Sequence, residues 1–278
     1  MMLFRSLRIL PVWTPLALLG CASTHEGRGL VLHVDKGKAM VTVSHEEIPG
    51  FMDAMAMPFA VRDPKSLDGL QPGDRIRFRM GVSHGETRLD RMRLISAAPA
   101  DTGLTMSPAA SMLTRIGDRM PDFSLIDQDG EAVSLATLRG SVVAVTFIYS
   151  RCPLPDYCPR MVSNFRKVRD RYSDRLGHDL TLLTISFDPK YDTPEVLKKY
   201  ARLLGVDLPG WRFLTGPPDA IATVCAAFGI EYWSDQGLIT HTLQTAVIDR
   251  DGRLAATVEG KDYTSQQITD LVGDVLNR

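Results

Sequence analysis

The sequence feature that most constrains the fold is a continuous apolar run that leads into a pair of cysteines. Residues 142–149 are almost entirely apolar and rich in β-branched side chains, and Cys152 and Cys158 follow them. A short run of this composition predicts a strand that is covered on both faces of a sheet. A helical pattern of apolar residues resumes at Met161, so both thiols fall between a buried strand and a helix. We therefore expect redox or metal chemistry at this strand's carboxyl end, where the start of the helix favours a thiolate.

Strand and helix patterns alternate through residues 117–278, which we expect to form one domain. A hairpin is predicted over residues 123–135. The other predicted elements are strands at 180–187, 211–214, 243–248 and 254–258, and helices beginning near Met161, Pro194, Pro218 and, with a capping box, Thr264. Asp188 and Asp192 are expected only to turn the chain and to cap a helix. This alternation predicts an α/β layered fold, and the hairpins make its sheet a mixed one.

The region before this domain has the pattern of a small all-β domain, so the chain is expected to be multidomain. Residues 30–43 alternate around a turn, and further strands are predicted at 75–80 and 87–94. We expect a small β-rich domain over residues 29–96, preceded by a tether at residues 21–28. Residues 97–116 are rich in Ala, Pro, Ser, Thr and Gly without periodicity, which predicts a flexible linker.

The first 20 residues have the composition of an export signal. Arg5 and Arg8 precede an apolar stretch, Ile9 to Leu19, that is shorter than the roughly 20 residues needed to span a bilayer. The sequence Leu18-Leu19-Gly20-Cys21 resembles a bacterial lipobox. It predicts a lipoprotein signal peptide over residues 1–20, lipidation of Cys21, and a protein that faces the periplasm from the inner or the outer membrane. The alternative is a simple secretory signal.

Charge and cysteine content narrow the functional classes. Loss of residues 1–20 lowers the 32 basic residues to 30, against 33 acidic residues, so the exported chain carries a net charge of −3. This balance gives no basic footprint for nucleic acid. With Cys21 lipidated, the neighbouring pair Cys152 and Cys158 is either a disulfide or a metal site in an oxidising compartment. Cys225 lies on an apolar helical pattern and is expected to be an inert buried thiol.

A histidine and three methionines gather within thirteen residues of the first domain. They are His45, Met52, Met55 and Met57. Imidazole and thioether ligands together suit Cu(I), which is a soft ion. In an extended segment Met55 and Met57 point to the same face, because the side-chain period is two, and His45 folding back would complete a three-coordinate site. The alternative interpretation makes the methionines adaptable core residues.

On these residues, the first domain resembles the CusF-type periplasmic copper-binding domain, a small OB-like barrel. The resemblance rests on a strand-borne histidine, a loop, and Met-x-Met followed by a strand that ends in Phe, here His45, Met55, Met57 and Phe59. It implies that His45, Met55 and Met57 bind Cu(I). The family has a tryptophan three residues before the first methionine of the pair. Met52 stands there in this chain and becomes a candidate fourth ligand.

Spacing alone leaves the cysteine pair open as a disulfide, a dithiol redox pair or two thiolate ligands. Pro153 and Pro155 stiffen the loop between them and keep it extended. The Cys-x-x-Cys spacing and the late proline of thioredoxin-type exchange are both missing, since no proline follows Pro218. His241 stands just before a late strand instead. A histidine beside two thiolates forms a mixed nitrogen and sulfur set that can hold copper in either oxidation state.

Further motifs of the second domain surround these residues: Tyr149-Ser-Arg-Cys152-Pro, Cys158-Pro159, Ile185-Ser-Phe-Asp188-Pro189, Asp192-Thr193-Pro194-Glu195, and His241 with Asp251-Gly252. On these motifs, the second domain resembles the Sco/SenC family, thioredoxin-fold copper chaperones of the cell envelope. The resemblance implies that Cys152, Cys158 and His241 bind Cu(I) or Cu(II). It also implies a cuproprotein client, such as the copper-site subunit of a respiratory cytochrome oxidase. The family has three residues between its cysteines and this chain has five, which keeps a redox role open.

Three functional hypotheses use these residues. An envelope copper metallochaperone would use both sites and would meet the membrane only through its lipid anchor. A thiol-disulfide oxidoreductase that reduces client cysteines for metal loading would be an enzyme acting through Cys152 and Cys158. A copper-resistance buffer would need the first domain alone. We take the metallochaperone as the leading hypothesis and leave enzymatic activity open.

Overall fold

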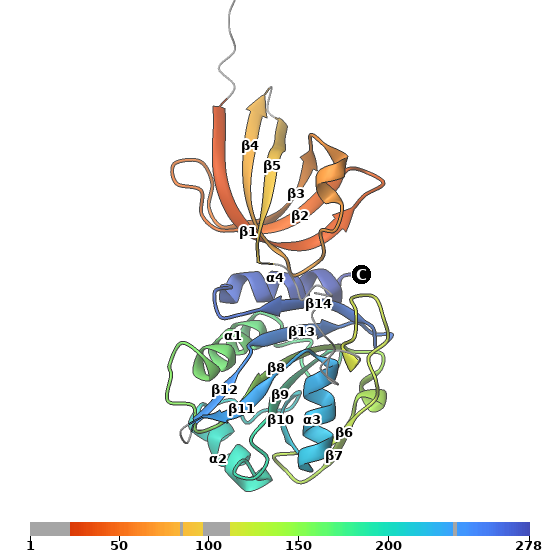
Figure 1. Cartoon of the computed structure of the whole chain (residues 1–278), viewed down its shortest axis with the longest axis vertical. Helices are drawn as coiled ribbons and strands as arrows, with labels where there is room; N and C mark the ends of the chain where they lie inside the picture. The colour runs from red at the N-terminus through yellow and green to blue at the C-terminus, as the bar shows by residue number, and fades with distance from the viewer. Residues whose placement is uncertain (1–22, 84–85, 97–111, 236–237) are drawn as a thin grey trace, which may run out of the picture.

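A β-barrel rests on the last helix of a layered α/β domain in the computed structural model (Figure 1). The structure describes residues 23–83, 86–96, 112–235 and 238–278. Cys21, the predicted signal peptide and most of the predicted linker lie outside these ranges. None of the helices in the described ranges is both long and apolar enough to cross a membrane.

The first domain is a closed five-stranded barrel with the strand order β1-β2-β3-β5-β4. Its strands are β1 (Ser23–Asp35), β2 (Met40–His45), β3 (Met55–Val61), β4 (Arg75–Ser83) and β5 (Glu86–Ser96). A short 3-10 helix, η1 (Pro64–Leu67), follows β3. β1 closes the barrel by pairing with β4, and only β3 and β5 run parallel among the pairs in this domain's described residues. Alternate side chains such as Val41, Val43 and Phe59 fill the interior, which confirms the all-β, OB-like prediction.

The predicted tether at residues 21–28 is wrong for its described part, because β1 begins at Ser23. This strand pairs with β4 from Ser23 opposite Val82 to Leu30 opposite Arg75. The glycines of this strand serve close packing. A Cβ atom on Gly27 would lie 2.6 Å from the Phe78 ring. Glycine is required here because the interior leaves no room for a side chain.

The second domain is built on a seven-stranded mixed sheet with the order β14-β13-β8-β9-β10-β6-β7. Its strands are β6 (Ser124–Asp127), β7 (Ala132–Ser134), β8 (Val142–Ile148), β9 (Leu180–Ser186), β10 (Trp211–Thr215), β13 (Gln244–Ile248) and β14 (Leu254–Glu259). β8, β9 and β10 are parallel, and the other pairs in this sheet are antiparallel. Every residue of β8 and β9 is buried, as the apolar runs predicted. A short 3-10 helix, η3 (Leu135–Leu138), follows β7.

Four helices cover this sheet: α1 (Cys158–Arg171), α2 (Pro194–Leu203), α3 (Pro218–Ala227) and α4 (Ser265–Leu276). α1 and α4 pack side by side, with α4 next to the barrel, while α2 packs against β10 and α3 against β6 (Figure 1). The predicted capping box of Thr264 and Gln267 is present at the start of α4. Together with the mixed sheet, these helices form the predicted thioredoxin-like fold.

Two features of the second domain differ from the predictions. A separate two-stranded hairpin, β11 (Tyr232–Asp235) and β12 (Leu238–His241), was not predicted. The end of the predicted linker is also part of the domain. The backbone N–H of Thr114 donates to the carbonyl of Ala227 at 3.0 Å, and Ile116 packs against the core. Residues 113–116 are therefore attached to the second domain.

The barrel packs on the second domain through buried apolar side chains, a hydrogen bond and a close backbone approach. Leu30 and Leu32 of β1 are 0% and 2% exposed and belong to the apolar core of the second domain. The Arg278 side chain donates to the carbonyl of Leu32 at 3.2 Å. Gly73 approaches β14 so closely that a Cβ atom on it would lie 1.8 Å from the carbonyl oxygen of Thr257. The linker is thus not the sole connection between the domains.

Candidate metal and thiol sites

The cysteine loop, residues 149–157, carries the chain from β8 to α1. Cys158 is the first residue of α1, three residues earlier than the predicted start at Met161. Its side chain is fully buried, whereas Cys152 in the loop is half-buried. Both thiols are free, and so is that of Cys225. The loop therefore places one thiol in the core and one near the surface.

The two thiols differ in acidity. Mainly because it receives a hydrogen bond from Cys158, Cys152 has its pKa lowered to about 5, and the Tyr149 hydroxyl contributes a further bond. The pKa of Cys158 is raised, first by donation to Cys152 and then by burial. We expected the helix start to favour a thiolate, but Cys158 occupies that position, and its hydrogen bond to Cys152 together with its burial keeps it protonated. The acidic thiol is Cys152.

His241 faces the buried thiol from the end of β12. Its Nε2 atom lies 3.8 Å from Cys158 Sγ, and its Nδ1 atom lies 2.9 Å from the carbonyl oxygen of Thr242. Nδ1 must donate to that carbonyl, so the Nε2 lone pair points to the sulfur. The rings of Phe187 and Tyr149 pack around the imidazole at centroid distances of 4.5 Å and 5.9 Å. Burial lowers the pKa of His241, which favours the neutral form that binds metals.

This arrangement brings together the three residues that the sequence assigned to copper. Among the described residues, no three His, Cys, Asp or Glu side chains are already arranged to hold a metal ion. The donor set nevertheless fits a soft ion, because an imidazole lone pair faces the sulfur atom of Cys158, and Cys152 supplies a second thiol nearby. Cys158 must lose its proton before the set can close around a metal.

A polar network under the cysteine loop was missed by the sequence analysis. Asp192 is 0% exposed, and its carboxylate accepts from the Ser150 N–H at 3.0 Å, the Ser150 hydroxyl and the Ser186 hydroxyl at 2.5 Å. Arg151 donates to Asp188 at 2.6 Å. Both carboxylates therefore hold the cysteine loop, while Thr193 caps α2. Asp188 and Asp192 lie 37 and 42 residues beyond the loop residues that they bind, so the available signal was their place in the motifs Ile185–Pro189 and Asp192–Glu195.

The histidine and methionines of the barrel share one face. His45 pairs with Met55 and Val43 pairs with Met57 across β2 and β3. Val43 points into the barrel, so His45, two residues further on, lies on the interior side with both methionines opposite. Met55 is 43% exposed and Met57 is partly buried, which puts this face at the mouth of the barrel.

His45 has a free ring nitrogen within this face. The side chain is 1% exposed, and its Nδ1 lies 2.8 Å from the Glu46 carbonyl oxygen. Its Nε2 is buried without a hydrogen-bond partner among the described residues. A buried lone pair without a partner next to thioethers fits a soft-metal ligand. Met52 packs against the barrel core at the end of the Ile48–Met52 turn, and its role as a fourth ligand stays a prediction.

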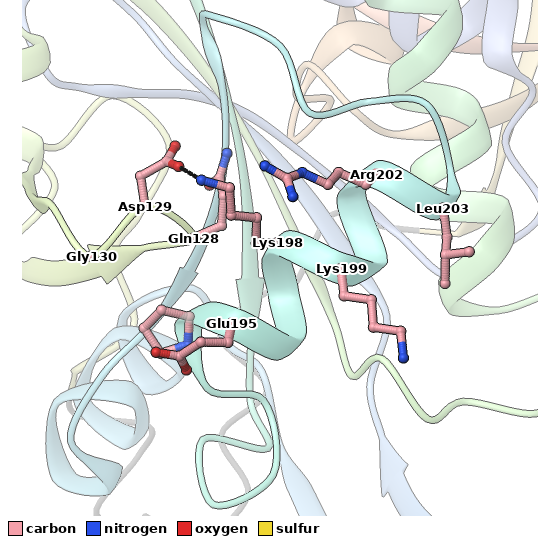
Figure 2. A pocket seen from close by; sticks show the side chains of 9 residues that line it. Gln128, Asp129, Gly130, Glu195, Lys198, Lys199, Arg202 and Leu203 are labelled. Atoms are coloured by element: carbon pink, nitrogen blue, oxygen red, sulfur yellow. Dashed lines mark hydrogen bonds and ion pairs between the residues drawn. The ribbon is translucent and has the colours of Figure 1, made fainter.

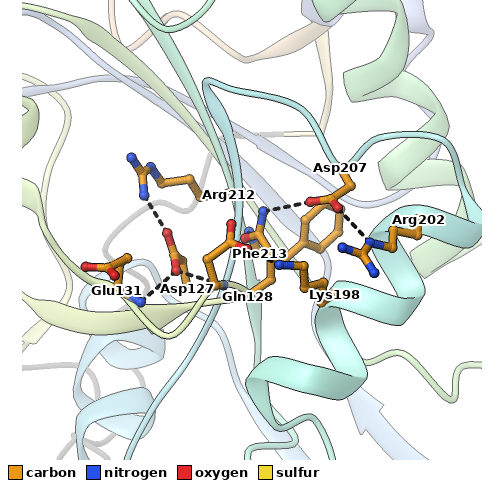
Figure 3. A network of polar contacts seen from close by, with 9 residues as sticks. Asp127, Gln128, Glu131, Lys198, Arg202, Asp207, Arg212 and Phe213 are labelled. Atoms are coloured by element: carbon orange, nitrogen blue, oxygen red, sulfur yellow. Dashed lines mark hydrogen bonds and ion pairs between the residues drawn. The ribbon is translucent and has the colours of Figure 1, made fainter.

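A cavity of about 700 Å³ lies elsewhere, between α2 and the turn that joins β6 to β7 (Figure 2). Two of its basic side chains have acidic partners: Lys198 pairs with Asp129, and Arg202 with Asp207 at 3.1 Å. Gln128 joins the same network by donating to Asp207 at 3.5 Å (Figure 3). These contacts attach α2 to the β6–β7 turn, so we assign this region a structural role.

The fold and the cysteine loop define a thioredoxin-like protein with a dithiol at the end of a parallel strand and a histidine opposite it. The SCO1/SenC family model matches residues 114–276, more than half of the chain. The chain therefore belongs to the SCO1/SenC family. A second model, copper binding periplasmic protein CusF, matches residues 24–93.

Relatives and solved structures agree with this assignment. An SCO2-like protein of Rickettsia typhi is 32% identical over 139 residues, which cover 47% of this chain and 65% of that protein. An SCO1 homologue of Bacillus subtilis is 27% identical over 159 residues, covering 55% and 79%. The match thus spans less than two thirds of the Rickettsia relative.

Two solved structures share the fold of the second domain. Arabidopsis thaliana ScoI with copper bound has a TM-score of 0.51 at 24% identity, covering 58% of this chain and 100% of that chain. A SCO1/SenC family lipoprotein from Bacillus anthracis has a TM-score of 0.52 at 23% identity, covering 59% and 98%. Likeness at this level of identity establishes the fold.

Proposed function

We propose that this protein is a cell-envelope copper metallochaperone that delivers copper to a cuproprotein client. Copper is its cargo. Cu(I) would bind to His45, Met55 and Met57 at the barrel mouth, with Met52 as a further ligand. Cu(I) or Cu(II) would bind to Cys152, Cys158 and His241 in the second domain. The proposed client is a copper-site subunit of a respiratory cytochrome oxidase.

One observation carries this proposal. The Nε2 atom of His241 faces Cys158 Sγ at 3.8 Å while Nδ1 is held by the Thr242 carbonyl. This tautomer and orientation are those of a metal ligand with its second nitrogen fixed. Copper-binding relatives support the same conclusion, since the matched structure from Arabidopsis thaliana has copper bound.

Copper titration of the exported chain tests the proposal. We expect two copper ions per chain, with the second-domain ion lost in Cys152→Ala, Cys158→Ala and His241→Ala. Cys225→Ala is the matched control, because it removes a buried thiol outside the site. The Cu(II) form should show a thiolate-to-copper charge-transfer band that these three variants lose. Unchanged copper stoichiometry in all three variants would refute the second-domain site.

Thiol-disulfide exchange is the second candidate function. It is favoured by the contrast between an acidic, half-buried Cys152 and a buried Cys158 that donates to it, since such a pair has a nucleophile and a resolving thiol. Rapid turnover of a disulfide substrate by a chain that binds no copper at these cysteines would select this function. Slow turnover together with tight copper binding would select the chaperone.

We also propose that the chain is a periplasm-facing lipoprotein anchored through Cys21. The lipobox-like sequence before this residue supports the proposal. Mass spectrometry of the chain expressed in a bacterial host should find an acylated N-terminal cysteine and no residues 1–20. A Cys21→Ser variant that stays membrane-bound would contradict this anchor.

A further inference from the structure

The barrel meets the second domain directly behind its candidate metal ligand. Ser44, which precedes His45 on β2, is 1% exposed. Its hydroxyl donates to the Asp270 carboxylate at 2.5 Å, and its carbonyl accepts from the Gln267 side-chain amide at 3.4 Å. Both partners belong to α4. This contact between the domains therefore lies one peptide bond away from His45.

Neighbouring residues of a strand point to opposite faces, which explains this geometry. Ser44 points outward to α4, while His45 points into the barrel. The carbonyl that Gln267 holds belongs to the peptide group that joins Ser44 to His45. With Nδ1 held by the Glu46 carbonyl, the free Nε2 has its direction set by how this end of β2 is held.

Gln267 is itself fixed by the cap of α4. Its side-chain Oε1 atom accepts from the backbone N–H of Thr264 at 2.8 Å, and the backbone N–H of Gln267 donates to the Thr264 hydroxyl at 3.2 Å. The side chain is 2% exposed, so it has little freedom to move. Gln267 thus completes the helix cap with its Oε1 atom and contacts the barrel with its Nε2 atom.

We propose that α4 forms a functional part of the histidine–methionine site, with Ser44, Gln267 and Asp270 as positioning residues for His45. The proposal rests on the assignment of His45 as a copper ligand. Loss of one of these hydrogen bonds should weaken Cu(I) binding by the barrel about fivefold, the equivalent of one net hydrogen bond. By linkage, Cu(I) at His45 should tighten the docking of the barrel on α4 by the same factor.

The test uses the full exported chain with Cys152→Ala and Cys158→Ala, so that only the barrel binds Cu(I). Competition with a chromogenic Cu(I) chelator gives the affinity. Gln267→Glu is the central variant, because glutamate keeps the capping oxygen but cannot donate to Ser44. Ser44→Ala and Asp270→Ala remove the second bond. Asp262→Asn is the control, since Asp262 also faces the barrel but is exposed and lies 4.0 Å from Arg75.

We expect Gln267→Glu, Ser44→Ala and Asp270→Ala each to weaken Cu(I) binding, and Asp262→Asn to leave it unchanged. The NMR signal of the His45 ring should shift in the first three variants before copper is added, which a loss of stability alone would not cause. Wild-type affinity in Gln267→Glu and Asp270→Ala would overturn the positioning role. If His45→Ala also leaves Cu(I) binding intact, the metal site itself fails instead.

Discussion

At the level of single residues, the two thiols of the cysteine loop have different tasks. Cys152 is half-buried and acidic, while Cys158 is buried, protonated and faced by His241. An incoming Cu(I) ion would meet the thiolate of Cys152 first. Deprotonation of Cys158 would then complete the site, so copper binding should release a proton.

The acidity of Cys152 gives a prediction on pH. A pKa lowered to about 5 means that the thiolate is present at every pH above that value and is lost as the pH falls through it. Alkylation of Cys152 by iodoacetamide should therefore stay fast down to about pH 5. In Cys158→Ala the main hydrogen bond is lost, and the midpoint should rise toward the ordinary value of about 8.5. The pH profile of the modification rate, with peptide mass mapping, measures both midpoints.

Cys225 provides the control for this experiment. Burial raises its pKa to about 12, so it should stay unmodified in the folded protein across the same pH range. A Cys225→Ala variant should reproduce the wild-type profile of Cys152. An unchanged Cys152 midpoint in Cys158→Ala would show that the bond from Cys158 is not the cause of its acidity.

At the level of elements, the cysteine loop depends on a buried carboxylate from the segment after β9. Asp192 binds the backbone and side chain of Ser150 and the side chain of Ser186. This bond set attaches the loop to the end of the neighbouring parallel strand. Helix α1 carries Cys158 and the hairpin β11–β12 carries His241, the two candidate ligands that face each other.

Replacement of Asp192 should loosen this loop and destabilise the protein. Asp192→Ala leaves the Ser150 N–H and the hydroxyls of Ser150 and Ser186 without their acceptor. This loss should lower the free energy of unfolding by roughly 2 to 4 kcal/mol. Urea denaturation measures the loss. Asp170→Ala is the matched control, because Asp170 is 49% exposed and pairs with its neighbour Arg169. The free energy of unfolding of this variant should stay within about 0.5 kcal/mol of the wild-type value. Equal stability of the two variants would contradict the role of Asp192.

The elements that the sequence predicted well are those whose patterns arise locally. The apolar run of β8 and the capping box of α4 each followed from period and composition. The hairpin carrying His241 could not be predicted in this way, because Tyr232–Asp235 and Leu238–His241 have only four residues each. The start of β1 was also not predicted, since the close packing of Gly27 depends on Phe78, which is distant in sequence.

The same distinction applies to the candidate site. The candidate ligands Cys152, Cys158 and His241 could be named from the sequence, because donor chemistry is a property of each side chain. The unequal acidity of the thiols could not, because it depends on which sulfur is buried and which way the hydrogen bond points. The positioning of His45 by α4 depends on a contact over more than two hundred residues.

For the whole molecule, the docking of the barrel makes the two domains one cooperative unit. Leu30 and Leu32 are buried in the core of the second domain, so separation would expose apolar surface on both sides. Gly73 sets how closely the domains approach, because its backbone contacts that of Thr257. The orientation of the barrel is therefore a property of the fold.

Gly73→Ala should separate the domains. The added methyl group would overlap the Thr257 carbonyl oxygen, so we expect a larger radius of gyration in small-angle X-ray scattering and two unfolding transitions in place of one. Gly69→Ala is the control: its φ of 77° matches the left-handed strain at Gly73, with a φ of 97°, and nothing lies within 4 Å of its added Cβ. If the two variants behave alike, backbone strain alone explains the effect and the close approach carries no weight.

The hairpin of β11 and β12 has a consequence for how copper would leave the protein. Cys158 is anchored in the core, but His241 lies on a two-stranded hairpin outside the main sheet. Two-stranded hairpins are only marginally stable by themselves, so the packing of this hairpin against Phe187 and Tyr149 keeps His241 in place. If that packing opened, an acceptor would compete with two sulfur atoms instead of three candidate ligands. The residence time of the cargo would be set by the opening rate of a small hairpin.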